Sequence, residues 1–173
     1  TGVDLEEHPQ VFGRVDKFIQ GNLDAGLPEG LSESIDVVVC ADVLEHVRQP
    51  ELLLAELAPR LAQGGAVLAS IPNFGHWYPR IRTLIGMFDY DHRGILDRTH
   101  VRFFTRRSFE RLAKQAGYTV HRVGATGLPF DVADRGGAGK VSNKLKPVRA
   151  IDRVLVKLRP QLFAYQFLYE LKR

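Results

Sequence analysis

The sequence predicts an α/β fold with a Rossmann-like, mostly parallel sheet whose last strand is antiparallel. Apolar runs of strand length alternate with longer stretches of helical period, which is the pattern of βα units. The β-branched run at 35–41 is too short for a typical helix, and we expect a central strand buried on both faces there. The aromatic run at 162–173 is predicted to close the sheet as an antiparallel strand.

The composition is that of one globular domain spanning 1–173. The chain is 45% hydrophobic and 25% charged, which excludes a disordered or fibrous class. No apolar run approaches the roughly 20 residues of a membrane-spanning helix, and the N-terminus has no signal sequence, so we expect a cytoplasmic protein without a membrane partner. The single cysteine, Cys40, rules out an internal disulfide. Much of the net charge of +4 lies in 140–159, where we expect a solvated basic helix face rather than a nucleic-acid site.

The first half of the chain predicts two short strands, a central strand and a helix. The short strands are expected near 1–5 and 16–23, with a short helix at 8–15 between them. After the central strand, Pro50 begins a helix whose leucines repeat at helical spacing, and Gly64 and Gly65 are expected to end it. The predicted apolar stripe of that helix is Leu53, Leu54, Leu57 and Leu61.

The second half predicts further strands and helices around two irregular segments. Thr105 is expected to cap a helix that ends at Gly117. Residues 125–146 are rich in Gly, Asp and Ser and predict a mobile loop. The other expected elements are a strand at 66–73, a helix at 77–88, an irregular stretch at 89–104, a strand at 118–125 and a helix at 148–158.

The Gly-rich stretch 135–140 does not have the spacing of a phosphate-binding loop. A Walker-type loop needs Gly where Asp134 stands, and Ser or Thr where Val141 stands. We therefore interpret it as part of the loop at 125–146.

Groups suited to a nucleoside follow several predicted strands, and ligands of parallel sheets bind at the carboxyl ends of the strands. A carboxylate there can accept hydrogen bonds from both hydroxyls of a ribose, and an amide can read the edge of a purine. Small side chains let a ligand approach the backbone. Each group alone would also suit a turn that ends a strand, but together they predict a nucleoside site. In chain order they are Asp4, Asn22 with Leu23, Cys40 with Ala41, and Asn73.

The stretch 21–73, with its Leu-Glu-His-Val, Gly-Gly and Pro-Asn motifs, resembles the middle of class I S-adenosylmethionine-dependent methyltransferases. The resemblance extends over about 1–125 and is strongest to the branch of ubiquinone-pathway O-methyltransferases and methionine-biosynthesis methyltransferase-like proteins. It implies S-adenosylmethionine as cofactor and a small-molecule or glycan acceptor, with oxygen as the favoured acceptor atom.

The resemblance also implies roles for the residues at the strand ends. Asp4 would hold the ribose, and Asn22 with Leu23 would contact adenine. The family often has Asp where Asn22 stands, but an amide oxygen still accepts a hydrogen bond. The turn that starts at Cys40 and Ala41 would border the methionine part of the cofactor.

One feature of the family is absent from the sequence. Family members open with a strand and a Gly-rich loop, and this chain starts after that point. We therefore expect a segment to precede Thr1, and without it two open sheet edges and weak cofactor binding. The alternative is a degenerate, non-catalytic methyltransferase-like interaction domain.

Asp42, Glu45 and His46 follow the predicted central strand. On a helix starting near Asp42 they would share one face, where they could hold a divalent cation. The favoured interpretation needs no metal: Asp42 caps the helix and Glu45 interacts with its positive N-terminus. His46 is then a candidate proton acceptor.

Residues 74–104 are interpreted as an insertion on the acceptor side. His100 lies in this segment and is the candidate base for removing the acceptor proton. Arg98 or Arg102 could hold an acidic group of the acceptor. The alternative is a structural hairpin pinned by Asp97 and Arg98.

Overall fold

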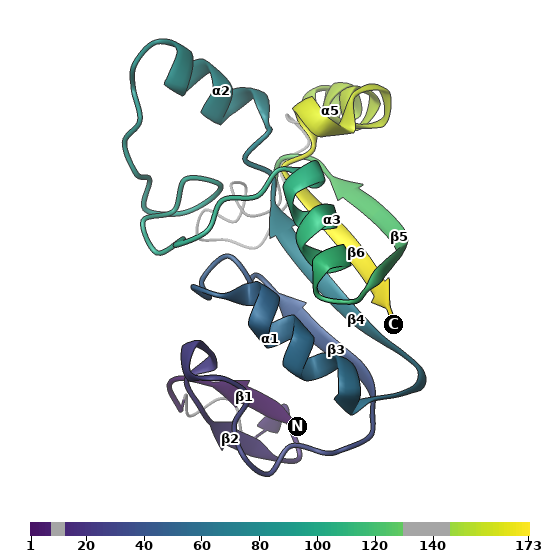
Figure 1. The fold of residues 1–173 in the computed structure, drawn as a ribbon. Coiled ribbons are helices and arrows are strands. Elements are labelled where there is room, and N and C mark those ends of the chain that lie inside the picture. The colour runs from purple at the N-terminus through teal and green to yellow at the C-terminus, as the bar shows by residue number, and fades with distance from the viewer. Residues whose placement is uncertain (8–12, 130–145) are drawn as a thin grey trace.

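The computed structural model describes residues 1–7, 13–129 and 146–173, which form two sheets with helices against them (Figure 1). β1 and β2 pair in parallel, and the second sheet has the order β3-β4-β6-β5. β3 and β4 are parallel, while β6 runs antiparallel to both of its neighbours. The predicted α/β fold with an antiparallel last strand is confirmed. The strands are β1 (Gly2–Asp4), β2 (Phe18–Gln20), β3 (Ile35–Ala41), β4 (Leu61–Pro72), β5 (Thr119–Thr126) and β6 (Gln166–Lys172).

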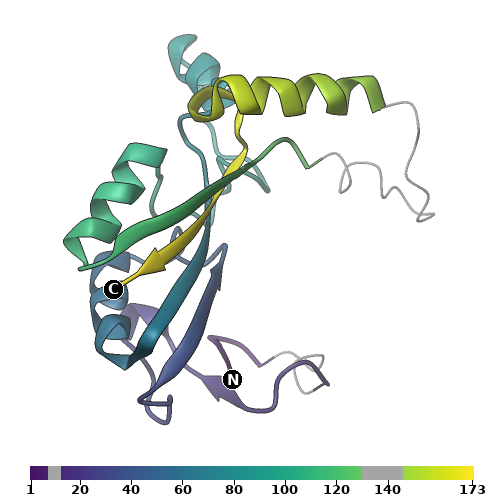
Figure 2. The same ribbon diagram turned by 90° about the vertical axis from the view of Figure 1, so that its right-hand side faces the viewer.

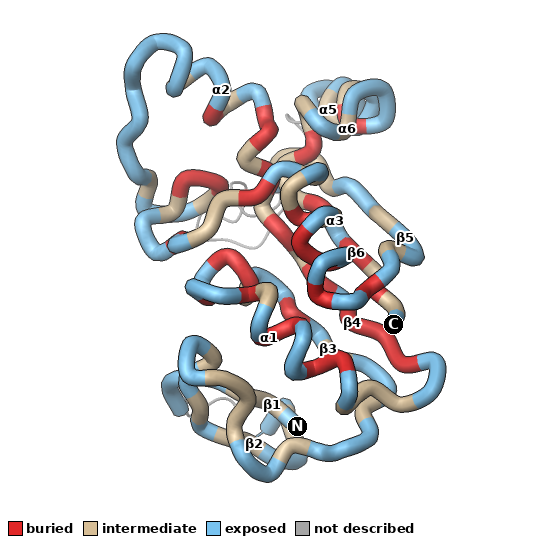
Figure 3. Tube along the Cα trace, viewed as in Figure 1, coloured by how far each residue is buried: buried red, intermediate tan, exposed pale blue. Residues whose placement is uncertain are grey.

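Two helices, α1 and α3, cover one face of the four-stranded sheet, while α2 and α5 lie at the end where β4 finishes (Figures 1 and 2). The core is buried between the sheet and the first two of these helices (Figure 3). The helices are α1 (Pro50–Leu57), α2 (Trp77–Leu84), α3 (Arg106–Gln115), α5 (Lys146–Leu158) and α6 (Pro160–Phe163), with short 3-10 turns η2 (Leu23–Ala25) and η3 (Ala58–Arg60).

α3 forms as its sequence predicts. The Thr105 hydroxyl accepts the backbone N–H of Ser108, and the Ser108 side chain in turn accepts the N–H of Thr105, which completes a capping box. Phe109 and Leu112 are buried against the sheet. Gly117 ends the helix with φ of 88°, a conformation that favours glycine.

α1 is shorter than predicted. It ends at Leu57, because Pro59 has no backbone N–H to continue the hydrogen-bond ladder. Leu61, expected on the helical stripe, is instead the first residue of β4, and Gly64 and Gly65 lie within that strand. A side chain at Gly65 would lie 2.9 Å from a carbonyl oxygen of β3, so glycine permits the close approach of the two strands.

The prediction that β3 is buried on both faces is wrong. Val37 and Val39 are 52% and 65% exposed. Among the described residues, β3 pairs with β4 alone and β1 with β2 alone, so each has one edge without a strand partner. Side chains alternate between the two faces of a strand, so Val37 and Val39 point to the face opposite Val38 and Cys40, which pack toward the core, and α1 and α3 leave that opposite face uncovered.

Residues 74–104 contain α2 followed by the predicted irregular stretch. The backbone N–H of Arg98 donates to the carbonyl of Asp91 at 3.1 Å, which closes a small loop. The Arg82 side chain pairs with Asp91 at 2.7 Å, and the Tyr78 hydroxyl donates to the same carboxylate at 2.8 Å. This network fixes the irregular segment to α2.

Two predicted segments fall partly outside the described residues. These are the helix at 8–15, of which 8–12 are not described, and the loop at 125–146 with the Gly-rich stretch 135–140. Within the described part, β5 extends to Thr126 and α5 begins at Lys146.

Candidate functional site

A polar cavity of about 590 Å³ lies beyond the carboxyl ends of β3 and β4. Residues from the turn after β3, from the 74–104 segment and from the start of β6 line it together. Ligand sites of parallel sheets occur at this edge. Its titratable lining groups are Asp42, Glu45, His46, Asp97, His100 and Tyr165.

The turn after β3 is not the predicted helix. β3 ends at Ala41, Asp42 adopts φ of 53°, and α1 begins only at Pro50. The left-handed φ of Asp42 takes the chain out of the strand without starting a helix. The expectations that Asp42 caps a helix and that Glu45 lies at a helix N-terminus are therefore both wrong.

Asp42 instead joins three strands. The Ser70 hydroxyl donates to Asp42 Oδ1 at 3.0 Å, and the N–H of Asp42 donates to Ser70 Oγ at 2.9 Å. The amide of Gln166 donates to the same carboxylate oxygen. Since Ser70 is in β4 and Gln166 in β6, these contacts fix the turn against the sheet. No local sequence pattern points to either partner, because Ser70 and Gln166 lie far from Asp42 along the chain.

Glu45 is buried, with 1% of its surface exposed, and its two carboxylate oxygens have no hydrogen-bond partner among the described residues. Burial raises the pKa of Glu45 to about 7, its backbone N–H opposes this, and the charge of Asp42 adds to the increase. The carbonyl oxygen of Glu45 accepts the N–H groups of Val101 and Arg102, each at 3.0 Å. These bonds bring the 74–104 segment onto the turn.

His46 and His100, the two predicted catalytic residues, lie together. The Nδ1 atom of His46 lies 3.1 Å from the carbonyl oxygen of Thr99, and that of His100 lies 3.2 Å from the carbonyl oxygen of Ile95. A carbonyl only accepts, so each Nδ1 donates its proton there, and in the neutral form of either ring the lone pair is on Nε2. His46 is exposed and His100 is buried. Burial is the main cause that lowers the pKa of His100, which favours its neutral form.

Glu45, His46 and His100 have side-chain ligand atoms that all lie within 4.8 Å of one another. Two imidazoles and a carboxylate form a donor set that suits a transition-metal ion. The sequence suggested a different set as the less favoured alternative, with Asp42 in the place of His100, and the favoured interpretation there needed no metal. Asp42 is not part of the group, because its carboxylate binds Ser70 and Gln166.

Asp97 and Arg102 stabilise the loop. Burial acts to raise the pKa of Asp97. The N–H and the hydroxyl of Thr99 donate to Asp97 Oδ1 at 2.8 and 2.7 Å, and these hydrogen bonds act to lower the pKa, as do the nearby imidazoles. The net effect is a lowered pKa. Arg102 donates to the carbonyl of Arg48 and pairs with Glu51 at 3.5 Å. Arg102 therefore fastens the segment to α1, which leaves it less suited to hold an acceptor.

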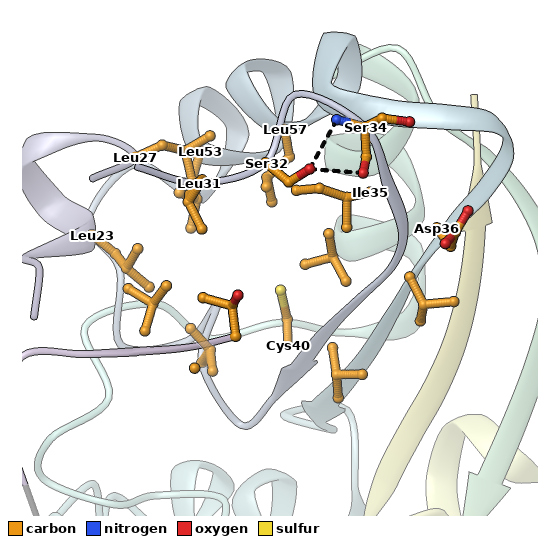
Figure 4. Close-up of a pocket in the computed structure, with 17 residues that line it drawn as sticks. Leu23, Leu27, Leu31, Ser32, Ser34, Ile35, Asp36, Cys40, Leu53 and Leu57 are labelled. Carbon is orange, nitrogen blue, oxygen red and sulfur yellow. Dashed lines mark hydrogen bonds between the residues drawn. The ribbon is translucent and has the colours of Figure 1, made fainter. Parts of the chain in front are cut away.

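A second cavity, of about 670 Å³, lies between the facing edges of β1 and β3 (Figure 4). Leucine side chains and the thiol of Cys40 surround it, including Leu23, Leu53 and Leu57. Burial raises the pKa of Cys40 to about 11, so its thiol stays neutral. Leu23 and Cys40, both predicted at the cofactor, thus line one apolar cavity.

The other predicted cofactor residues lie in two separate places, at the end of the β1–β2 sheet and on the four-stranded sheet. Asp4 and Asn22 follow the paired strands β1 and β2 at the same end, where the N–H of Gly21 donates to the carbonyl of Asp4 at 2.9 Å. Asn22 also caps η2 by accepting the N–H of Asp24. Successive strand residues point to opposite faces. Accordingly, Cys40 lines the apolar cavity, whereas Ala41 lines a shallow pocket on the other face of the sheet.

A family model described as a methyltransferase domain matches residues 1–123. The chain belongs to this methyltransferase family. The predicted class of S-adenosylmethionine-dependent methyltransferases is thereby confirmed, whereas the ubiquinone-pathway branch stays a prediction. A search of curated proteins gives no match.

Solved structures of methyltransferases share the fold of this methyltransferase. A SAM dependent methyltransferase from Archaeoglobus fulgidus has 17% identity and a TM-score of 0.59, with 99% of this chain and 75% of that chain covered. One from Mesorhizobium loti has 14% identity and a TM-score of 0.56, with 99% and 79% covered. A putative methyltransferase from Bacillus halodurans has 14% identity and a TM-score of 0.52, with 93% and 74% covered. These similarities confirm the Rossmann-like fold.

The helices of the described residues include none long and apolar enough to cross a membrane.

Proposed function

We propose that this methyltransferase transfers the methyl group of S-adenosylmethionine to a hydroxyl of a small-molecule or glycan acceptor bound in the polar cavity. The cluster of Glu45, His46 and His100 supports this most directly, because it gathers proton-accepting groups at the edge of the sheet where ligands bind. The cofactor supplies an electrophilic methyl group on its sulfonium. The protein must position the acceptor oxygen and take up its proton.

On the cofactor side, the residues fit the adenosine part. The carboxylate of Asp4 is exposed, and the hydrogen bond that it accepts from the N–H of Glu6 at one oxygen leaves capacity for ribose hydroxyls. Asn22 and Leu23 follow the adjacent strand, where they contact adenine. Cys40 contributes a neutral, apolar wall, and Ala41 keeps the backbone beside the cofactor accessible.

On the acceptor side, His100 is the base. Its Nε2 lone pair is held ready by the Nδ1 hydrogen bond to Ile95, and burial keeps the ring neutral. His46 lies beside His100 as a second proton acceptor or as a group that orients the substrate. The pKa of Glu45 is raised to about 7, and in its ionised form this carboxylate stabilises the imidazolium that forms when the proton arrives.

Calorimetry with S-adenosylhomocysteine tests the cofactor site. The variant D4A should lose most of the binding heat, whereas E33A, which removes an exposed acid just before the amino end of β3, should keep it. Unchanged binding by D4A would refute the ribose assignment.

Methyl transfer from labelled S-adenosylmethionine to sugar and phenol hydroxyls, compared with amines, tests the acceptor atom. Transfer to amines alone would overturn the assignment to oxygen.

A further inference from the structure

We propose that α5 is an interfacial helix that binds a membrane surface carrying anionic lipids. The helix spans Lys146–Leu158 and leaves large apolar side chains in solvent. Val148, Ile151, Val154 and Leu158 are 45%, 60%, 55% and 70% exposed. Their spacing of three, three and four residues places them on one stripe of the helix.

The body of the protein contacts a different side of α5. Val156 is the buried residue of the helix, and the Asp152 carboxylate accepts a hydrogen bond from the N–H of Leu128. At 100° per residue, both positions lie well away from the centre of the exposed stripe. The apolar stripe therefore faces outward while the helix is held from behind.

The charge on α5 identifies the kind of surface that fits. The helix carries four basic residues and one acid, the latter engaged with Leu128. Lys146, Arg153 and Lys157 are exposed and lie between the apolar stripe and the side of the helix that contacts the body of the protein. An apolar face with lysine and arginine on the polar face is the pattern of helices that lie in the plane of an anionic lipid surface.

The shape of this end of the molecule favours a broad surface over a single partner helix. α2 lies at the same end as α5 (Figures 1 and 2). Leu84 and Ile85, at the end of α2, are 85% and 61% exposed. Apolar groups on two separate elements at one end suit a lipid surface, which can cover both. The sequence led us to expect no membrane partner, because it contains no spanning helix, and the present proposal departs from that expectation.

Vesicle co-sedimentation of the 173-residue protein tests the proposal. The wild-type protein should sediment with vesicles of phosphatidylcholine and phosphatidylglycerol, and far less with phosphatidylcholine alone. I151E should reduce binding at least about thirtyfold, because it places a charge in the apolar stripe. K157E should reduce it about tenfold and remove much of the salt dependence.

L52E is the matched control, because Leu52 is a 54% exposed helical leucine on α1. It should bind vesicles as the wild type does. Equal circular dichroism and thermal unfolding of all variants show that they are folded.

No sedimentation with anionic vesicles would overturn the proposal, as would equal binding to neutral vesicles. A dimer in light scattering that I151E dissociates would assign the stripe to a second copy instead. None of these outcomes depends on the methyl-transfer assay.

Discussion

The imidazole rings of His46 and His100 meet edge to face, with centroids 4.9 Å apart and an interplanar angle of 71°. Both rings donate through Nδ1 to carbonyl oxygens of the same loop, those of Thr99 and Ile95. That loop is itself held by the carbonyl of Glu45. Backbone carbonyls of the 74–104 segment thus orient both rings, and the carbonyl of Glu45 fixes that segment against the turn after β3, which brings the two Nε2 atoms to one place.

Replacing His100 should remove the proton acceptor. H100A is expected to lower kcat by a factor of about 10² to 10⁴, the usual contribution of a positioned base. H92A provides the control, since His92 is an exposed histidine of the same segment and should retain activity. Steady-state kinetics, with thermal unfolding to confirm the fold, measures the effect. Full activity of folded H100A would show that His100 is not the base.

Replacing Glu45 should change how stability depends on pH. The pKa of Glu45 is raised to about 7 from the model-peptide value of 4.5, so the protonated form is favoured in the folded state. Its stabilising contribution is fully present below pH 4.5 and is lost as the pH rises through about 7. E45Q, which stays neutral, should therefore be more stable than the wild type at pH 8 by up to about 3 kcal/mol.

Urea unfolding of E45Q and the wild type at pH 5 and pH 8 checks this prediction. The difference in unfolding free energy should grow with pH. E51Q, at a half-exposed glutamate on α1, should show no such growth. A wild type that stays more stable than E45Q at pH 8 would mean that a counter-charge compensates the buried carboxylate.

The sequence predicted the fold better than the site. Thr105, the β-branched run of β3 and the C-terminal aromatic run act through local chemistry, so α3, β3 and β6 appear where expected. The burial of β3 depends on which faces of the sheet the helices cover, which no local pattern reveals. The pairing of His46 with His100 likewise depends on backbone hydrogen bonds between distant segments. Asp42 misled the prediction because its residue type suits a helix cap as well as a left-handed turn.

A transition-metal ion should compete with the base. If Glu45, His46 and His100 act as proton-accepting groups, a chelator should leave methyl transfer unchanged. Added Zn²⁺ should inhibit, because it would occupy both Nε2 lone pairs and the carboxylate. The inhibition should weaken in H46A. Loss of activity with the chelator and recovery with metal would instead make the cation part of the site.

Replacing Asp42 with glycine should destabilise the protein less than replacing it with alanine. Either change removes the hydrogen bonds to Ser70 and Gln166, so both variants should be less stable than the wild type. At φ of 53°, however, an alanine carries a steric cost that glycine avoids. D42A should therefore be less stable than D42G by about 1 kcal/mol.

The same pair of substitutions at Asp36 supplies the comparison. Asp36 lies inside β3, and Asp42 alone among the described non-glycine residues has a positive φ. At Asp36 the order of stability should reverse, with D36A more stable than D36G, since glycine loses more backbone entropy than alanine in a strand. Chemical denaturation of the four variants measures both differences. If D42A were as stable as D42G, the hydrogen bonds alone would hold this turn, and its left-handed backbone would carry no measurable strain.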